Sequence, residues 1–165
     1  MSDTTAPRVS LFVTCLADLM RPSVAFASIR LLEQAGCIVD VPLQQTCCGQ
    51  PGYNAGEYEA TIPVAQQTIA LFEHAEYVVA PSGSCAGMIC HHYPRLLEGE
   101  WRERALALAE KTFELTSFLV DVVKLESAPA VSTELPPITY HDSCAGLREM
   151  GIKQQPRQLL QTLCN

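Results

Sequence analysis

Short apolar runs alternate along the chain with longer stretches in which apolar residues recur at every third or fourth position. Val9–Thr14, Cys37–Val41 and Tyr77–Ala80 are such runs, and their length and β-branched content are typical of buried strands. The longer stretches predict amphipathic helices. Their apolar positions are Val24, Ala27, Leu31 and Ala35 in one stretch and Tyr58, Ile62, Ala65, Ile69 and Phe72 in the next. Strands that alternate with helices predict an α/β fold: a parallel sheet with flanking helices in a Rossmann-like three-layer arrangement.

Proline and glycine mark where these helices begin and end. Pro22 opens the first predicted helix and Gly36 ends it, because proline suits a first helical turn and glycine suits a left-handed C-terminal position. Pro63 lies inside the second helix, where its missing N–H predicts a kink or a restart. Helical spacing continues over Trp101–Lys111 and again over Leu115–Lys124, so two further helices are expected.

The composition is that of a globular protein with a sizeable core. The chain has 165 residues, of which 48% are hydrophobic and 18% charged, and its formal net charge is −7. The lack of a Lys/Arg cluster argues against nucleic acid and anionic lipid as direct partners. No apolar run approaches the roughly 20 residues of a transmembrane helix, and the N-terminus does not resemble a signal peptide. A cytoplasmic protein with reduced cysteines is therefore expected.

The tandem thiol Cys47-Cys48, followed by Gly49, is the most informative motif. Adjacent cysteines do not easily form a relaxed disulfide, because one peptide holds their Cα atoms too close together. They do suit a shared metal centre, and a glycine lets the backbone approach an inorganic cluster closely. Cys15 and Cys85 each follow a predicted strand, so the thiols are expected at the carboxyl edge of the sheet, where doubly wound sheets bind ligands. Four thiolates there fit an iron–sulfur cluster or zinc.

The C-terminal part of the sequence repeats a feature of its beginning. Ile138–Cys144 is a predicted strand that leads into a cysteine, as Leu11–Cys15 does. Residues 126–137 are rich in Ser, Thr and Pro, which is typical of a linker. A first domain over residues 1–125 and the start of a second repeat over residues 138–165 are therefore predicted. A second tandem pair at the spacing of the first falls beyond the last residue, so we expect this repeat to be truncated.

The remaining cysteines receive separate predictions. Cys144 ends the repeated run and is a candidate ligand of a second cluster. Cys37 precedes a strand at the opposite edge of the sheet and is expected to be a core residue. Cys90 is a weak candidate for a substitute ligand, and Cys164 is expected to lie on a helix surface or in the core.

Several polar residues lie near the thiols in the sequence. Together with Gly49, the side chains of Asp18, Tyr53 and Asn54 are predicted to surround the cluster sulfurs and tune their potential through hydrogen bonds. His141-Asp142 has the form of a general-base pair, although a loop histidine that lines the second cysteine loop is the favoured interpretation. His91-His92 follows Cys90 on a helix and is expected to face solvent.

Taken together, these segments resemble those of a known family. Its pattern is a cysteine, a gap, Cys-Cys-Gly, a second gap and Cys-x-x-Cys. The chain is similar to the cysteine-rich CCG-domain family, which includes the cysteine-rich component of heterodisulfide reductase and the iron–sulfur subunits of glycolate and lactate oxidation. Within it, the resemblance is greatest to the lactate-utilisation protein A group. The similar segments are Val9–Leu16, Cys47–Pro51, Tyr53-Asn54, Pro81–Cys85 and Glu114–Thr116.

The resemblance implies a cofactor and its ligands. A full member of the family carries two CCG motifs, of which this chain holds the first and only Cys144 of the second. The last cysteine of Cys-x-x-Cys is replaced by Met88, whose thioether is a far weaker ligand than a thiolate. A four-thiolate [4Fe–4S] cluster is therefore expected in place of a five-cysteine double cluster. Its implied ligands are Cys15, Cys47, Cys48 and Cys85.

The resemblance also implies a function. Two alternative functions stay open beside it. The resemblance implies an iron–sulfur electron-transfer subunit, without catalytic residues of its own, in a complex that oxidises a 2-hydroxy acid such as L-lactate. The partners are then the other subunits of a lactate or glycolate oxidation complex, located in the cytoplasm or held peripherally at the inner membrane through those partners. One alternative is a structural or interaction module with zinc or an empty site. The other is thiol–disulfide chemistry of the heterodisulfide-reductase kind, which Met88 argues against.

Overall fold

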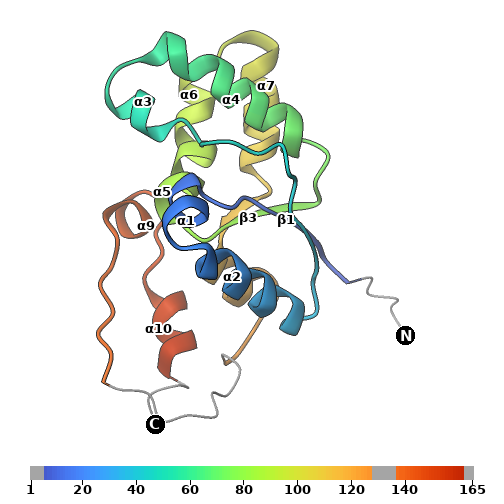
Figure 1. Ribbon diagram of the computed structural model, residues 1–165, viewed down its shortest axis with the longest axis vertical. Coiled ribbons are helices and arrows are strands. Elements are labelled where there is room, and N and C mark those ends of the chain that lie inside the picture. Colours follow the sequence, from blue (N-terminus) through green and yellow to red (C-terminus); the bar gives the residue numbers. More distant parts are fainter. Residues whose placement is uncertain (1–5, 128–136, 162–165) are drawn as a thin grey trace.

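The computed structural model describes residues 6–127 and 137–161 and contains a four-stranded parallel sheet (Figure 1). The strands lie in the order β2-β1-β3-β4. Val9 is opposite Val39 of β2 and Tyr77 of β3, and Val78 of β3 is opposite Thr112 of β4. The strands are β1 (Arg8–Leu11), β2 (Ile38–Asp40), β3 (Tyr77–Ala80) and β4 (Thr112–Glu114). The predicted α/β fold with a parallel sheet is confirmed.

Helices cover both faces of this sheet (Figure 1). One face is covered by α4 (Tyr58–Phe72), α6 (Tyr93–Leu96) and α7 (Gly99–Ala109), and the other by α2 (Pro22–Gln34), the π-helix η2 (Phe118–Val122) and α10 (Gln154–Gln161). Successive residues of a strand point to opposite faces. Val78 and Ala80 of β3 therefore enter the first core, whereas Val79 enters the second. Each strand thus supports two helical layers, which gives the three-layer arrangement.

Short helices follow the strands at the carboxyl edge of the sheet. They are α1 (Cys15–Met20), α3 (Gln50–Asn54), α5 (Gly83–Gly87) with the π-helix η1 (Met88–His92), and α8 (Leu115–Ser117). A further short helix, α9 (Cys144–Arg148), packs against α5. None of the helices in residues 6–127 and 137–161 is long and apolar enough to span a membrane.

The helix boundaries follow the proline and glycine signals with one exception. Helix α2 begins at Pro22, and Gly36 follows its end with φ +86°. Helix α4 runs unbroken through Pro63, so the predicted restart does not occur. The apolar face of α4 buries Ile69 and Phe72 against the sheet. Burial of such side chains contributes about 1.5–3 kcal/mol each, which outweighs the one helical hydrogen bond that proline cannot make.

Strand β4 was not predicted from the sequence. The two helical stretches on either side are present as α7 and as α8 with η2, but Thr112–Glu114 between them pairs with β3. Three residues are too short to show a period of two, so only the free edge of β3 makes them a strand. The Glu114 carboxylate then accepts hydrogen bonds from the N–H groups of Thr116 and Ser117 and caps α8.

The predicted strand at Ile138–Cys144 is wrong. Residues 137–143 are not part of a strand, and α9 begins at Cys144. A strand needs a neighbour to pair with, and helix α9, which ends this segment, packs against α5 instead. Gly146 of α9 lies so close to Gly83 that a Cβ on Gly83 would come 2.7 Å from the Gly146 Cα. The division into two repeats stays a prediction, and most of the predicted linker lies outside the described residues.

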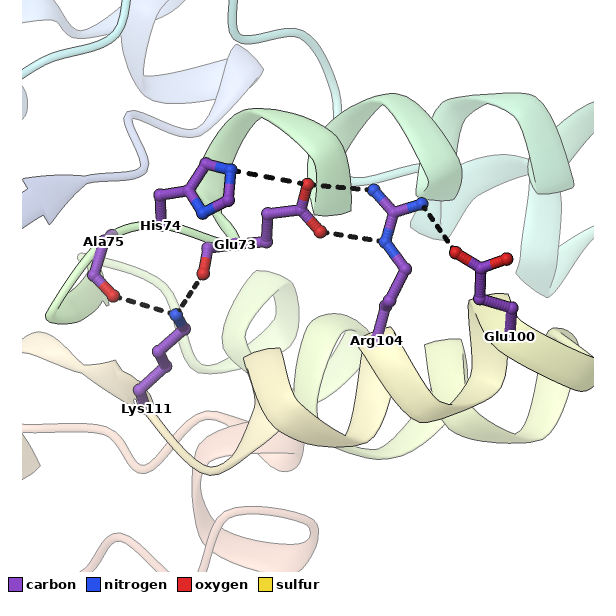
Figure 2. A network of polar contacts seen from close by, with 6 residues as sticks. All are labelled: Glu73, His74, Ala75, Glu100, Arg104 and Lys111. Atoms are coloured by element: carbon purple, nitrogen blue, oxygen red, sulfur yellow. Dashed lines mark hydrogen bonds and ion pairs between the residues drawn. The ribbon is translucent and has the colours of Figure 1, made fainter.

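An ion-pair network joins the end of α4 to α7 (Figure 2). Arg104 of α7 donates two hydrogen bonds to the Glu73 carboxylate, at 2.8 and 2.9 Å. The guanidinium also lies 3.9 Å from the Trp101 ring centroid. Lys111 Nζ donates to the backbone carbonyls of Glu73 and Ala75. A cation at the end of α4 complements the partial negative charge of a helix C-terminus.

Replacing Arg104 with methionine is expected to lower the free energy of unfolding by about 0.5–1 kcal/mol at neutral pH. Hydrogen bonds from Arg104 hold the pKa of Glu73 below its ordinary value of 4.5. The depressed pKa adds stability above the unfolded-state value, and this contribution is lost as pH falls through the folded-state pKa. Denaturant unfolding of Arg104→Met should therefore converge with wild type in acid. Arg102→Met, an exposed change on the same helix, should match wild type throughout.

Candidate metal centre

The strand order places one crevice at the carboxyl edge of the sheet. From β1 the chain moves to β2 on one side, then crosses back over β1 to β3 on the other side. The strand order therefore reverses between the neighbouring strands β1 and β3. Doubly wound sheets bind ligands outside the carboxyl ends of their strands at such a reversal. Cys15 begins α1 after β1, and Cys85 lies in α5 after β3. The Cys47-Cys48 loop follows β2 and leads into α3.

The four predicted cysteines meet in this crevice as two contacting pairs. The Cys15 and Cys47 sulfurs are 3.5 Å apart, and the Cys48 and Cys85 sulfurs are 3.4 Å apart. These are contacts between free thiols, since a disulfide bond measures about 2.05 Å. The structure therefore brings together, from three loops, all four residues that the sequence singled out.

Burial and hydrogen bonds between the thiols together determine their pKa values. Cys15 is exposed, whereas Cys48 and Cys85 are buried. The Cys48 thiol donates to Cys85, which, with the Ser82 and Ser84 hydroxyls, lowers the pKa of Cys85 to about 7. The same hydrogen bond, together with burial, raises the pKa of Cys48. Burial also raises the pKa of Cys15. Cys85 is therefore the thiol most readily available as a thiolate, the form that binds metal.

Gly49 shapes the turn after the tandem thiols. It has φ +81° and precedes α3, and its N–H lies 3.4 Å from the Cys47 sulfur. A Cβ at Gly49 would come 3.0 Å from Thr61 Cγ2. Glycine is thus required by both backbone conformation and space.

Tyr93 supports the tandem thiols and was missed by the sequence analysis. It is fully buried, and its hydroxyl donates a 2.8 Å hydrogen bond to the Cys48 carbonyl. Burial raises the pKa of this phenol above its ordinary value, so it stays a donor at neutral pH. Nothing in the sequence around Tyr93 indicates this contact, because it joins positions 45 residues apart.

Tyr93→Phe is expected to lower the free energy of unfolding of the metal-free protein by about 1–3 kcal/mol, because the buried Cys48 carbonyl loses its donor. Denaturant unfolding under reducing conditions measures this loss. Tyr58→Phe is the matched control, since Tyr58 is 51% exposed, and it should stay within about 0.5 kcal/mol of wild type. Equal losses in the two variants would contradict the positioning role of the Tyr93 hydroxyl.

The other residues predicted around the cluster take different positions. Tyr53 packs against the core that contains Cys48 and Cys85, and its ring contacts those of Tyr58 and His92. Asp18 on α1 and Asn54 on α3 are exposed. Their predicted hydrogen bonds to cluster sulfurs stay predictions.

The remaining cysteines lie outside the four-thiol group. Cys37 is buried in the second core, as predicted. Cys90 points its sulfur toward the carbonyls of Ala109 and Thr112, and burial raises its pKa to about 12. Cys144 is exposed at the start of α9, and Cys164 lies outside the described residues. Met88 is fully buried in the same core as Cys48 and Cys85.

The histidine predictions are partly corrected. The Asp142 carboxylate is held by Arg157 through bonds of 2.6 and 2.7 Å, which argues against its use to orient His141 as a general base. His92 was predicted to face solvent, and this prediction is wrong. Its side chain is only 18% exposed and lies 3.2 Å from Glu149.

The donor set fits an iron–sulfur cluster by number and chemistry. In residues 6–127 and 137–161, no three Cys, His, Asp or Glu side chains are arranged to hold a metal ion. The thiols form contacting pairs instead. In a [4Fe–4S] cluster four cysteine thiolates each bind a different iron, so such ligands surround a cluster and need not converge on one point. Buried Cys48 and Cys85 form the floor of this site and exposed Cys15 its rim.

Comparison with known proteins identifies the family. Residues 9–90 match the family model described as the CCG cysteine-rich domain. The chain contains a CCG cysteine-rich domain. The CCG domain therefore contains Cys15, Cys47, Cys48 and Cys85, and the match ends at Cys90. No solved structure gives a significant match.

Three curated relatives of this CCG protein have names that refer to lactate utilization. The chain is 48% identical over 158 residues to Lactate utilization protein A from Geobacillus sp. (strain WCH70), covering 94% of this chain and 65% of the relative. It is 49% identical over 159 residues to Lactate utilization protein A from Exiguobacterium sp., covering 93% and 63%. Lactate utilization protein A 2 from Bacillus cereus (strain Q1) is 44% identical over 155 residues, with 93% and 63% covered. The chain thus spans somewhat less than two thirds of these relatives.

Proposed function

We propose that this CCG protein is an iron–sulfur electron-transfer subunit of a system that oxidises a 2-hydroxy acid. The observation that carries the proposal is the meeting of four free thiols, as two pairs at 3.4 and 3.5 Å, at the reversal point of the sheet. Cys15, Cys47, Cys48 and Cys85 hold one [4Fe–4S] cluster. Such a cluster supplies one-electron chemistry when bound, and its surroundings set the potential.

The residues around such a cluster have different roles. Cys48 and Cys85 bind from the buried side, and Tyr93 fixes the backbone between the tandem thiols and Gly49. Cys15 binds from the exposed side. The neighbouring helix α1 leaves Leu16, Leu19 and Met20 between 68% and 78% exposed. Exposed apolar side chains beside a redox site suit a protein partner, so electrons enter or leave through the face of α1.

The substrate and partners come from the relatives. Their name refers to lactate utilization, so we assign L-lactate as the 2-hydroxy acid and the other subunits of its oxidation complex as partners. The chain acts in the cytoplasm or at the inner membrane through those partners. Deleting the gene should abolish lactate-dependent electron flow to the respiratory chain. Unchanged flow would overturn the lactate assignment while leaving the cluster untouched.

Metal analysis of protein purified without oxygen tests the cluster directly. Iron, zinc and acid-labile sulfide are measured together with the visible spectrum. About four irons and four sulfides per chain, as in one [4Fe–4S] centre, would support the proposal. Stoichiometric zinc without sulfide would replace it with a structural zinc module.

Thiol–disulfide exchange is a second candidate, favoured by the 3.4 Å Cys48–Cys85 contact and the lowered pKa of Cys85. A metal-free protein that takes up two electrons reversibly and loses two titratable thiols on oxidation would support it. Retention of this redox couple in Cys85→Ser would exclude it.

A further inference from the structure

His92 links the CCG turn to helix α9. It is the last residue of η1, a π-helical turn of a kind often found at functional sites. Its ring lies against Tyr53 of α3, with centroids 4.7 Å apart. Its Nε2 lies 3.2 Å from the Glu149 carboxylate, at the end of α9. Three elements that are distant in the sequence therefore meet at this imidazole.

One nitrogen of this ring has no partner. Nδ1 of His92 is buried, and no group of the described residues forms a hydrogen bond with it. When Nε2–H donates to Glu149, Nδ1 carries a free lone pair that can accept a proton. Glu149 is 39% exposed, so it also connects the ring to solvent.

His92 is linked to the four-cysteine site through two neighbours. It directly precedes Tyr93, whose hydroxyl donates to the Cys48 carbonyl. Its ring partner Tyr53 packs against the core that contains Cys48 and Cys85. The arginine ion pairs of residues 6–127 and 137–161 involve other elements, since Arg104 joins α4 to α7 and Arg157 of α10 binds Asp142. These contacts connect the thiol site to a base with an unused lone pair.

We propose that His92 and Glu149 form a proton-binding site coupled to the redox state of the four cysteines. The inference rests on the proposed iron–sulfur function. A one-electron donor reduces the cluster by one electron, and one proton from solvent forms an N–H bond at Nδ1 of His92. Oxidation returns the electron to an acceptor and the proton to solvent, so charge balances in both directions. Glu149 from α9 and Tyr53 from α3 are the titratable groups that face the ring.

A redox titration across pH tests the coupling. The cluster is reconstituted in the full chain without oxygen, reduced stepwise with dithionite, and followed by its visible absorbance from pH 6 to 9. The wild-type midpoint potential is expected to fall as pH rises, by at most about 59 mV per pH unit, the limit for one proton per electron. His92→Gln should give a potential that does not change with pH. Glu149→Gln should reduce the slope, because it removes the carboxylate that lies 3.2 Å from Nε2.

His74→Gln is the matched control, since it removes a histidine that is 93% exposed at the far end of α4. It should keep the wild-type slope. Far-ultraviolet circular dichroism and the iron content show whether each variant folds and loads. A slope that survives in His92→Gln, or a flat wild-type potential, would overturn the coupling while leaving the cluster established. Failure of wild type to bind iron would instead overturn the proposed function.

Discussion

Replacing Cys48 with serine is expected to reduce the iron content from about four per chain to below about one, while the domain stays folded. Serine keeps the size of cysteine, but its hydroxyl does not supply a thiolate ligand. Cys48 is 2% exposed and contacts Cys85 on the floor of the site. Loss of this ligand therefore opens the buried side of the cluster. Anaerobic reconstitution followed by iron and sulfide assays measures the effect.

Two cysteines of the same chain provide matched controls. Cys37→Ser places a hydroxyl at a position of similar burial, 7% exposed, but in the other core. A buried hydroxyl without a partner costs about 1–3 kcal/mol, so both variants should lose similar stability, yet Cys37→Ser should keep its iron. Cys144→Ser, at an exposed position, should change neither quantity. Full iron content in Cys48→Ser would show that the ligand assignment is wrong.

Gly49→Ala is expected to destabilise the protein by about 3 kcal/mol and to weaken iron binding. A residue with a Cβ at φ +81° costs about 1–2 kcal/mol, and crowding against buried Thr61 adds about 1 kcal/mol or more. Because Gly49 directly follows the tandem thiols, any shift that relieves this crowding also moves Cys47 and Cys48. Denaturant unfolding and iron content report the two effects separately.

The conformational cost and the crowding can be measured independently. Gly56 has the same φ of +81°, but a Cβ there meets nothing within 4 Å. Gly56→Ala should therefore cost only the conformational part and leave iron binding intact. Thr61→Ser removes the crowding Cγ2 and keeps the hydroxyl that donates to the Glu57 carbonyl. A double-mutant cycle of Gly49→Ala with Thr61→Ser should show a favourable coupling energy. Strict additivity would contradict the contact with Thr61.

The strand prediction succeeded or failed according to how much of each strand is determined locally. Val9–Leu11 and Tyr77–Ala80 lie in short, mostly apolar runs because both faces of the sheet are covered, and such runs are visible in the sequence. Thr112–Glu114 has no such pattern and becomes a strand only through pairing with β3. Ile138–Cys144 has the pattern but forms no strand in the described chain. A sequence pattern of this kind therefore does not suffice, because a strand also requires a partner; Ile138 and Tyr140 stay 47% and 41% exposed.

The four thiols, the glycine turn and the alternation that places them at one edge of a parallel sheet can all be predicted from the amino-acid sequence. These features follow from short-range rules: the side-chain period, the φ that glycine allows and the metal affinity of thiolates. The two sulfur pairs, the bond from Tyr93 to Cys48 and the contacts of His92 with Tyr53 and Glu149 depend instead on the folded arrangement. These contacts join residues 32 to 57 positions apart. Their geometry depends on how helices pack across the sheet, which no local pattern records.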